Sequence, residues 1–374
     1  MNTRCIVVIG HVDHGKTSLV RALTGIETDR LAEEKERGLS IALGFAHRAY
    51  PEGTIDFIDA PGHEDFIQAM VSGATGAQSI LAVISLTEGI GAQTLEHLTI
   101  AGLLGLTNAV IAVTKSDTLE PSSHAARLEV IRSELAQTPF ADAELLLCSA
   151  LTGDGLDALH LALQKTLSGP ANASAPLQSI LPIDRVFSMP GHGTIVTGTL
   201  LGQELHVNTH AVLQPDGRKT TVRGLQSRGE KRGLVKAGER VAVNLRGVAV
   251  KDIPRGAALC VGDALPPSTC FDVSIGLNPW SNTALKHNED IRVMFGTSSE
   301  IASVRVFGGK QIAPKQSGHA QLRFKKQVVG FAGQKAILRR LSPPETLGGA
   351  TILDPIAMPT KSTNKRRLAV LLAA

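Results

Sequence analysis

The stretch that decides the fold of the first part of this 374-residue chain is Gly10-His11-Val12-Asp13-His14-Gly15-Lys16-Thr17. It has the spacing G-x-x-x-x-G-K-[ST] and directly follows the apolar run Cys5–Ile9. After a strand and before a helix, this spacing predicts a phosphate-binding loop, whose glycines let backbone amides approach phosphate oxygens. We expect Lys16 to reach the outer phosphates and Thr17 to offer its hydroxyl to Mg²⁺. The predicted nucleotide-binding residues of this loop are Asp13, His14, Gly15, Lys16, Thr17 and Ser18.

Short β-rich runs alternate with helical patterns over the first 165 residues. The predicted strands are Cys5–Ile9, Thr54–Asp59, Ile80–Ser85, Ala109–Val113 and Glu144–Cys148. The predicted helices between them include Lys16–Leu23, Glu64–Ser72, Thr94–Leu104 and His124–Gln137. This order indicates an α/β domain over residues 1–170, with a doubly wound, mostly parallel sheet and ligands at the carboxyl ends of its strands.

A second motif completes the phosphate end of the predicted site. The sequence Asp59-Ala60-Pro61-Gly62-His63 follows the second predicted strand. There the carboxylate of Asp59 can hold Mg²⁺ through a water, and the amide of Gly62 can bond a terminal phosphate.

Two short motifs predict that the bound base is guanine. Asp117, in the string Thr114-Lys115-Ser116-Asp117, can accept hydrogen bonds from the N1 and N2 donors of guanine, a pair that adenine lacks. Ser149-Ala150 can supply a backbone amide to guanine O6. Four motifs in this order, each at a strand end, favour a site for GTP or GDP. Its predicted base-side residues are Thr114, Lys115, Asp117, Ser149 and Ala150.

These motifs resemble those of the translational GTPases, the relatives of elongation factor Tu. In that family the phosphate loop often reads G-H-V-D-H-G-K-T and the second switch reads D-x-P-G-H. The resemblance implies that His63 is the catalytic residue and positions the attacking water, because phosphoryl transfer needs placement more than covalent help. It also implies that Val12 and Leu39 form a hydrophobic gate, which keeps His63 from the water until the ribosome moves it.

The stretch Arg37-Gly38-Leu39-Ser40-Ile41 matches the first switch of that family with one departure. Threonine is usual where Ser40 stands. Serine keeps the hydroxyl for Mg²⁺ but lacks the β-branch that stiffens the side chain. We therefore expect Thr17, Ser40 and Asp59 to form the metal site. We also expect the first switch to be held less firmly than it is with threonine at position 40.

Longer stretches resemble one branch of this family, the selenocysteine-specific elongation factors. Leu23–Gly38 resembles their first-switch region, and Thr114 replaces the commoner asparagine as it does in that branch. Ile183–Gly198 and Ser342–Gly349 resemble parts of their second and third domains. The resemblance implies a factor that binds selenocysteinyl-tRNA, delivers it to the ribosome and hydrolyses GTP when the ribosome stimulates it.

A pocket for selenocysteine should offer positive charge. A selenol is more acidic than a thiol, so it is largely an anion near neutral pH, where cysteine and serine are neutral. Arg185, His192 and Arg246 are the candidates for this aminoacyl pocket, with Asp184 to orient them. Contact of the arginines with tRNA phosphates or acidic neighbours, and a turn role for His192 between two glycines, are open alternatives.

After residue 170 the helical signal almost vanishes. Residues 171–180 are predicted to be a linker, and turn-rich apolar runs after it predict two antiparallel β-barrels. The first barrel, 181–265, would hold the aminoacyl pocket, and the second, 266–358, would contact tRNA. Residues 359–374 are predicted to be a basic tail with no core to join. Residues 1–170 carry 11 Lys and Arg against 21 Asp and Glu, whereas 171–374 carry 27 against 13. This basic second half favours a nucleic-acid partner.

The composition describes an ordinary globular protein. The hydrophobic fraction is 43% and the mean hydropathy +0.09, with no apolar run of membrane-spanning length. The sequence Met-Asn-Thr-Arg-Cys leads into the first strand without a cleavable signal. We therefore expect a cytoplasmic protein with no membrane contact, acting as a monomer. Cys5, Cys148, Cys260 and Cys270 are predicted to be buried free thiols.

One expected part is absent from the sequence. The selenocysteine-specific factors carry a C-terminal arm of winged-helix modules that grips a hairpin in the messenger RNA, and the sequence ends where that arm would begin. Residues 359–374 look like the start of this missing arm. Either the chain is truncated or it naturally lacks direct hairpin binding. A tRNA-carrying GTPase of the initiation-factor type, and a GTP-dependent regulator that delivers no tRNA, are the alternative functions.

Overall fold

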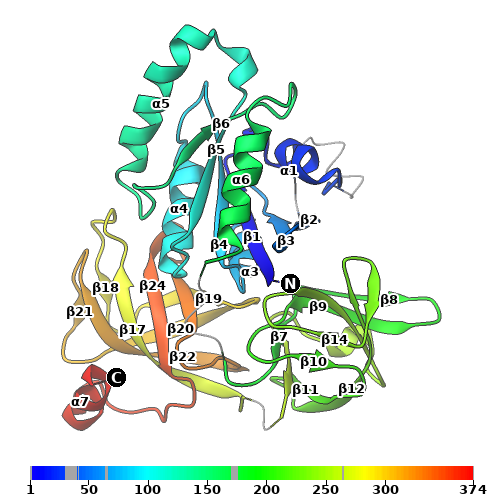
Figure 1. Cartoon of the computed structure of the whole chain (residues 1–374). Helices are drawn as coiled ribbons and strands as arrows, with labels where there is room; N and C mark the ends of the chain where they lie inside the picture. The colour runs from blue at the N-terminus through cyan, green and yellow to red at the C-terminus, as the bar shows by residue number, and fades with distance from the viewer. Residues whose placement is uncertain are drawn as a thin grey trace. The chain divides into compact units, whose positions relative to one another are not determined.

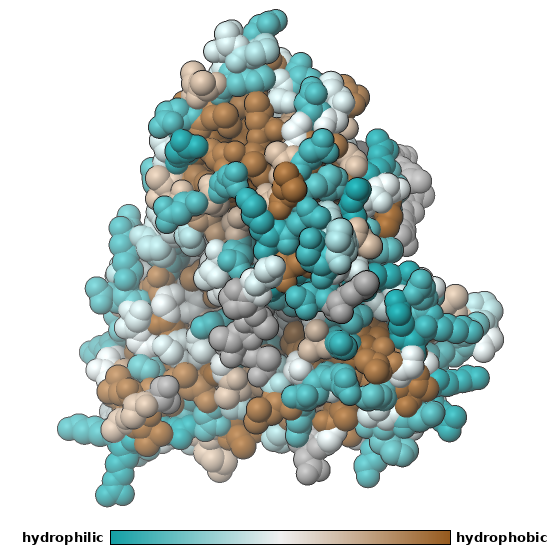
Figure 2. Space-filling view, viewed as in Figure 1, coloured by the Kyte–Doolittle hydropathy of each residue, from teal (hydrophilic) through white to brown (hydrophobic). Residues whose placement is uncertain are grey.

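The computed structural model describes residues 2–29, 40, 42–63, 66–169, 176–262 and 265–373. The chain forms two compact units, Met1–Ala173 and Ser174–Ala374, whose elements are drawn in Figure 1. The predicted order, an α/β domain followed by antiparallel β domains, is confirmed. No helix of the described ranges is long and apolar enough to cross a membrane. In the face drawn in Figure 2, hydrophilic and hydrophobic residues are interspersed.

A six-stranded sheet in the order β2-β3-β1-β4-β5-β6 forms the centre of the first unit. The strands are β1 (Asn2–Gly10), β2 (Gly44–Tyr50), β3 (Gly53–Asp59), β4 (Ser79–Ser85), β5 (Ala109–Thr114) and β6 (Leu145–Leu147). All neighbours are parallel except β2, which runs antiparallel to β3. Strand β2 was not predicted, because Gly-Phe-Ala-His-Arg-Ala-Tyr contains no β-branched residue.

Helices cover both faces of this sheet. They are α1 (Lys16–Thr24), α3 (Ile67–Ala74), α4 (Ala92–Leu103), α5 (Pro121–Leu135) and α6 (Leu156–Thr166), with the short 3-10 helix η2 at Ser116–Thr118. Apolar residues of α1 and α6 share one core with β1 and β3, whereas α3 packs against α4. Helix α6 was not among the predicted helices. The parallel strands β1, β3, β5 and β6 end at the same edge of the sheet, and the four nucleotide motifs follow these ends.

The second unit begins with a curved antiparallel sheet in the order β7-β16-β11-β12-β15-β9-β8, with β13 beside β12. Its strands are β7 (Ile180–Pro182), β8 (Arg185–Met189), β9 (Gly193–Thr199), β11 (His210–Gln214), β12 (Arg218–Ser227), β13 (Glu230–Arg232), β15 (Arg240–Leu245) and β16 (Ala258–Val261). A small ladder joins β10 (Leu205–His206) to β14 (Leu234–Val235), and a 3-10 helix, η3, spans Val250–Asp252. Two backbone hydrogen bonds between Ile180 and Leu201 tie β7 to the residues that follow β9. Strand β7 thus begins at the last residue of the predicted linker.

A closed barrel in the order β17-β22-β20-β19-β23-β24 follows. Its strands are β17 (Ser268–Leu277), β19 (Asp290–Phe295), β20 (Ser298–Val306), β22 (Ser317–Val328), β23 (Lys335–Arg340) and β24 (Glu345–Asp354), and β18 (Leu285–Lys286) pairs with β21 (Gln311–Ile312). Phe271, Phe295 and Phe324 pack in its core, with ring centroids 5.1–6.0 Å apart.

The C-terminal tail packs on this barrel, so the expectation that it has no core to join is wrong. Helix α7 (Lys365–Leu372) buries Leu371, which is 4% exposed. Arg367 forms ion pairs with Asp272 of β17 and Asp354 of β24. The sequence pattern of the tail could not predict this packing. The ion pair between Arg367 and Asp272 joins residues nearly a hundred positions apart, and a hydrophobic pattern does not show such a contact.

Candidate functional site

The phosphate loop has the backbone conformation that its two glycines allow. Gly10 and Gly15 have φ angles of 151° and 84°, which other residues rarely adopt. A Cβ atom on Gly10 would lie 2.3 Å from the carbonyl oxygen of Val83. Gly15 is the N-cap of α1 and no side chain caps that helix. The first amides of α1 are therefore available to an anion.

Lys16 is held inside this loop. Its Nζ donates a hydrogen bond to the backbone oxygen of His11 at 2.7 Å, and the residue is only 7% exposed. Burial lowers the pKa of Lys16, while the carboxylates of Asp59, Asp13 and Asp29 oppose that effect. The amine thus lies at the loop where the outer phosphates of a nucleotide would bind.

Asp59 collects hydroxyl groups at the place predicted for Mg²⁺. Its Oδ2 accepts hydrogen bonds from Thr17 Oγ1 at 2.9 Å and Thr28 Oγ1 at 2.8 Å. Its Oδ1 is buried and has no hydrogen-bond partner among the described residues. Burial raises the pKa of this carboxyl, and Lys16 opposes the shift. An orphaned carboxylate oxygen beside threonine hydroxyls fits a hard cation such as Mg²⁺.

Ser40 joins the same group of side chains. Its Oγ lies 3.2 Å from Thr17 Oγ1 and donates to Asp29 Oδ1 at 2.7 Å. The three predicted metal residues, Thr17, Ser40 and Asp59, are therefore brought together. Asp29 was not predicted, because no nucleotide motif contains it.

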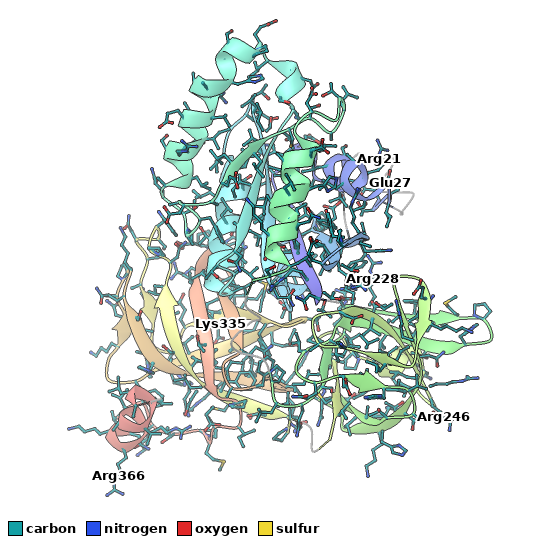
Figure 3. The ribbon with its side chains drawn as sticks, viewed as in Figure 1. Arg21, Glu27, Arg228, Arg246, Lys335 and Arg366 are labelled. Atoms are coloured by element: carbon teal, nitrogen blue, oxygen red, sulfur yellow. The ribbon has the colours of Figure 1, made fainter. Side chains whose placement is uncertain are left out.

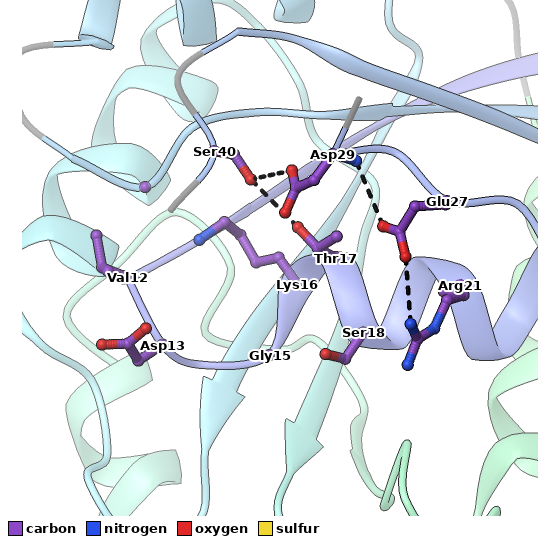
Figure 4. Close-up of a pocket in the computed structure, with 11 residues that line it drawn as sticks. Val12, Asp13, Gly15, Lys16, Thr17, Ser18, Arg21, Glu27, Asp29 and Ser40 are labelled. Atoms are coloured by element: carbon purple, nitrogen blue, oxygen red, sulfur yellow. Dashed lines mark hydrogen bonds and ion pairs between the residues drawn. The ribbon is translucent and has the colours of Figure 1, made fainter. Parts of the chain in front are cut away.

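A cavity of about 340 Å³ opens beside these residues. Figure 4 draws the residues that line it. The cavity is lined by Val12, Asp13, Gly15, Lys16, Thr17, Ser18, Arg21, Glu27, Asp29, Ser40 and Gly62. Arg21 and Glu27, which form an exposed ion pair at 3.2 Å, were not predicted as site residues. Of the predicted gate, Val12 lines the cavity, whereas Leu39 lies outside the described residues. His63 follows Gly62, and its ring centroid lies 6.1 Å from that of Phe66.

The buried side chains of His14 and Thr114 support the phosphate loop from inside the protein. His14 is fully buried, and its Nδ1 lies 3.3 Å from the backbone oxygen of Val83. Burial lowers the pKa of its imidazole, which favours the neutral form. The hydroxyl of Thr114 donates to the backbone oxygen of His14 at 2.7 Å. Both side chains are thus used inside the protein, which leaves only their backbones to face a nucleotide.

The two predicted base motifs lie next to each other. The backbone amide of Ser116 donates to the oxygen of Cys148 at 3.3 Å, which joins the Thr114–Asp117 string to the residue before Ser149. Lys115 Nζ pairs with Glu88 Oε1 at 3.0 Å, and the Ser149 hydroxyl accepts hydrogen bonds from the backbone amides of Leu151 and Thr152, each at 3.2 Å. Asp117, Ser149 and Ala150 are not among the residues that line the 340 Å³ cavity.

In the second unit, the carboxylate of Asp184 is bound by partners that the sequence analysis missed. Arg240 donates to both of its oxygens, at 2.8 and 3.1 Å, and Thr197 Oγ1 donates at 2.7 Å. The Asp184 side chain is 5% exposed. These contacts give Asp184 a role in holding β9 and β15, since its oxygens are already bound.

The other three aminoacyl candidates lie on the surface of this unit. Arg185 is an exposed residue of β8, and His192 is exposed in the turn before β9. The backbone oxygen of His192 accepts a hydrogen bond from Asn244 Nδ2 at 2.6 Å. Arg246 follows β15 and projects outward in Figure 3. Asn244 therefore connects the His192 turn to the strand that leads to Arg246.

Comparison with known proteins shows what the chain is similar to. Residues 1–169 match the elongation factor Tu GTP-binding domain. The chain is 39% identical over 95% of its length to the selenocysteine-specific elongation factor of Desulfomicrobium baculatum, and 33% identical over 93% to that of Escherichia coli strain K12. It spans only 56% and 55%, respectively, of the length of these relatives.

Solved structures agree with these matches. A bacterial selenocysteine-specific elongation factor, EF-Sec, is 31% identical and superimposes with a TM-score of 0.90, covering all of this chain and 62% of that one. Translation elongation factor SelB from Methanococcus maripaludis, in complex with the GTP analogue GppNHp, shares the fold with a TM-score of 0.81 at 24% identity, covering 98% of this chain and 81% of that one. The resemblance expected from the sequence is thus confirmed.

Proposed function

We propose that this chain, whose residues 1–169 match the elongation factor Tu GTP-binding domain, binds GTP with Mg²⁺ and delivers selenocysteinyl-tRNA to the ribosome. The observation that carries this proposal is the 39% identity to a selenocysteine-specific elongation factor along 95% of the chain. The phosphate cavity supports it, because its loop, buried lysine and orphaned carboxylate match what a nucleoside triphosphate requires.

The residues at the phosphate end of the site bind the phosphates and offset their negative charge. The α1 amides and Lys16 bind the phosphate oxygens. Thr17, Asp59 and Ser40, whose side chains lie together in the structure, would hold Mg²⁺. A Mg²⁺ ion held there would supply positive charge against the negative charge that develops on the phosphates. On the base side, Asp117 accepts the two guanine donors and the Ser149-Ala150 turn supplies an amide to O6.

Hydrolysis depends on the placement of a water by His63. This residue directly follows Gly62, which lines the phosphate cavity, so His63 stands next to that cavity in the chain. We propose that the ribosome moves the His63 side chain past Val12 of the hydrophobic gate, so that His63 can position the water.

The hydrolysis step is tested with His63→Ala. This variant should lose ribosome-stimulated phosphate release and still bind GTP. His47→Ala, a change on β2 in the same unit, serves as the control and should behave like the unaltered chain. Full stimulation in His63→Ala would refute the role of His63, and no stimulation in the unaltered chain would favour the regulator that delivers no tRNA.

Selection of the aminoacyl group is assigned to the second unit. Arg185 and Arg246 would offer positive charge to a selenolate, and His192 would offer a hydrogen bond. A neutral serine side chain would gain little from that charge. Protection of the aminoacyl ester against hydrolysis measures this selection. The GTP-loaded chain should protect selenocysteinyl-tRNA and leave seryl-tRNA unprotected, and Arg246→Met should weaken that difference. Equal protection of both tRNAs would refute the proposal, and strong binding of initiator tRNA would favour the initiation-factor type.

A further inference from the structure

His124, near the start of α5, contacts the loop that carries Asp117. Its Nε2 lies 3.1 Å from the backbone oxygen of Ser116 and 3.0 Å from that of Leu119. Both neighbours are carbonyl oxygens, which only accept hydrogen bonds. The Nε2 atom therefore carries the proton and shares it between the two carbonyls. The half-buried imidazole thus joins the residues that directly precede and follow the segment Asp117–Thr118.

The loop that His124 contacts has a conformation that needs support. Lys115 adopts φ 60° and ψ 35°, in the left-handed region that residues with a Cβ atom rarely occupy. Such a residue persists only where the surrounding contacts hold it. The amide of Ser116 is held by the oxygen of Cys148 at 3.3 Å. With the contact from His124 to its oxygen, both backbone polar groups of Ser116 are fixed, one by helix α5 and the other by the residue that follows β6.

Fixing the Ser116 carbonyl also fixes the direction of the next residue. The Ser116 carbonyl and the Asp117 amide belong to one planar peptide group. A rotation of that plane would swing the Cα–Cβ bond of Asp117. A carboxylate that must meet two donors of a planar base tolerates only a small displacement, on the order of 0.5 Å.

We infer that His124 is a positioning residue for guanine recognition, because it clamps the backbone on both sides of Asp117. The inference rests on the proposed function, in which Asp117 binds the N1 and N2 donors of the base. His124 acts on the nucleotide only through this loop. It belongs to no nucleotide motif and was predicted only as the first residue of a helix.

The test compares GDP with inosine diphosphate, whose base keeps the N1 donor and lacks the N2 amino group. The variants are His124→Ala, His124→Leu, which fills the space without a donor, and His124→Gln, whose amide nitrogen can donate from a similar distance. Loss of the clamp should weaken GDP binding about tenfold and reduce the preference for GDP over inosine diphosphate at least about threefold. His124→Gln should keep that preference within about twofold of the unaltered chain.

A control on the same helix separates positioning from general stability. Arg127 of α5 donates to the backbone oxygens of Leu86 at 3.0 Å and Thr87 at 2.6 Å, so it makes the same kind of contact with a different loop. Arg127→Ala should lower the melting temperature and leave the preference for GDP unchanged. An equal loss of preference in Arg127→Ala would show that any loosening of α5 suffices, which would overturn the inference.

Asp117→Asn distinguishes failure of the inference from failure of the proposed function. This variant should shift binding from guanosine toward xanthosine diphosphate, because an amide donor replaces one acceptor. If it does not, the proposed base contact itself is wrong. If it does, and both His124→Ala and His124→Leu keep the full preference for GDP over inosine diphosphate, His124 has no positioning role.

Discussion

Gly62→Ala tests how closely the second switch packs on the phosphate loop. An ideal Cβ atom on Gly62 would lie 2.6 Å from Lys16 Nζ, 2.9 Å from the amide nitrogen of Val12 and 3.0 Å from the carbonyl oxygen of Gly10. The end of the lysine can swing away. The two backbone atoms cannot easily move, because Gly10 itself lies against Val83.

The size of the effect follows from these distances. Ordinary van der Waals contact begins at 3.4 Å, so the backbone of the loop must move by about 0.4–0.5 Å. Overpacking of this kind costs about 1–3 kcal/mol of unfolding free energy. For a domain of this size that lowers the melting temperature by about 2–12 °C. GTP should lose more affinity than GDP, because the displaced Lys16 amine serves the outer phosphates.

Two measurements check this prediction. Thermal unfolding without nucleotide reports the packing cost, and titration with fluorescent GTP and GDP analogues reports the affinity ratio. Gly233→Ala is the matched control, because no atom lies within 4 Å of its Cβ position and its φ is not positive. It should leave both measurements nearly unchanged. If Gly62→Ala matched this control in both, the close packing between the second switch and the loop would be refuted.

Three further predictions concern buried charges. Arg240→Leu leaves the Asp184 carboxylate, which is 5% exposed, without its main partner. The variant should lower the free energy of unfolding, measured in urea, by about 3–5 kcal/mol. A decrease below about 1 kcal/mol would contradict a buried ion pair. Burial lowers the pKa of His97 to about 3, so His97 stabilises the fold above the unfolded pKa of about 6.5 and this contribution is lost as the pH falls toward 3. His97→Gln should therefore reduce the loss of unfolding free energy between about pH 6 and pH 5 by about 1 kcal/mol, and an identical pH profile would disprove the shift. Arg367→Ala removes the partner of the fully buried Asp272 and should accelerate hydrogen exchange in α7, whereas unchanged exchange would show that the ion pairs do not hold the tail.

The nucleotide site could be predicted from the sequence because its parts are local. A phosphate loop is a short backbone conformation, so Gly10, Gly15 and Lys16 must stand at fixed spacing. The parallel strands are buried on both faces and read as continuous apolar runs, which placed Asp59 and Asp117 at strand ends. By itself, the sequence therefore determined the fold class, the guanine-nucleotide motifs and the resemblance to the selenocysteine-specific factors.

Only the tertiary structure decided which side chains hold these parts in place. Arg240 binds Asp184, His124 clamps the backbone around Asp117, and Arg367 ties the tail to the closed barrel. None of these contacts has a fixed sequence spacing, because each joins elements whose separation depends on how the whole chain folds. Hydrophobic periodicity shows which face of a helix or strand is buried. It does not show which residues of another element contact that face. The supporting contacts of the site are therefore visible only in three dimensions.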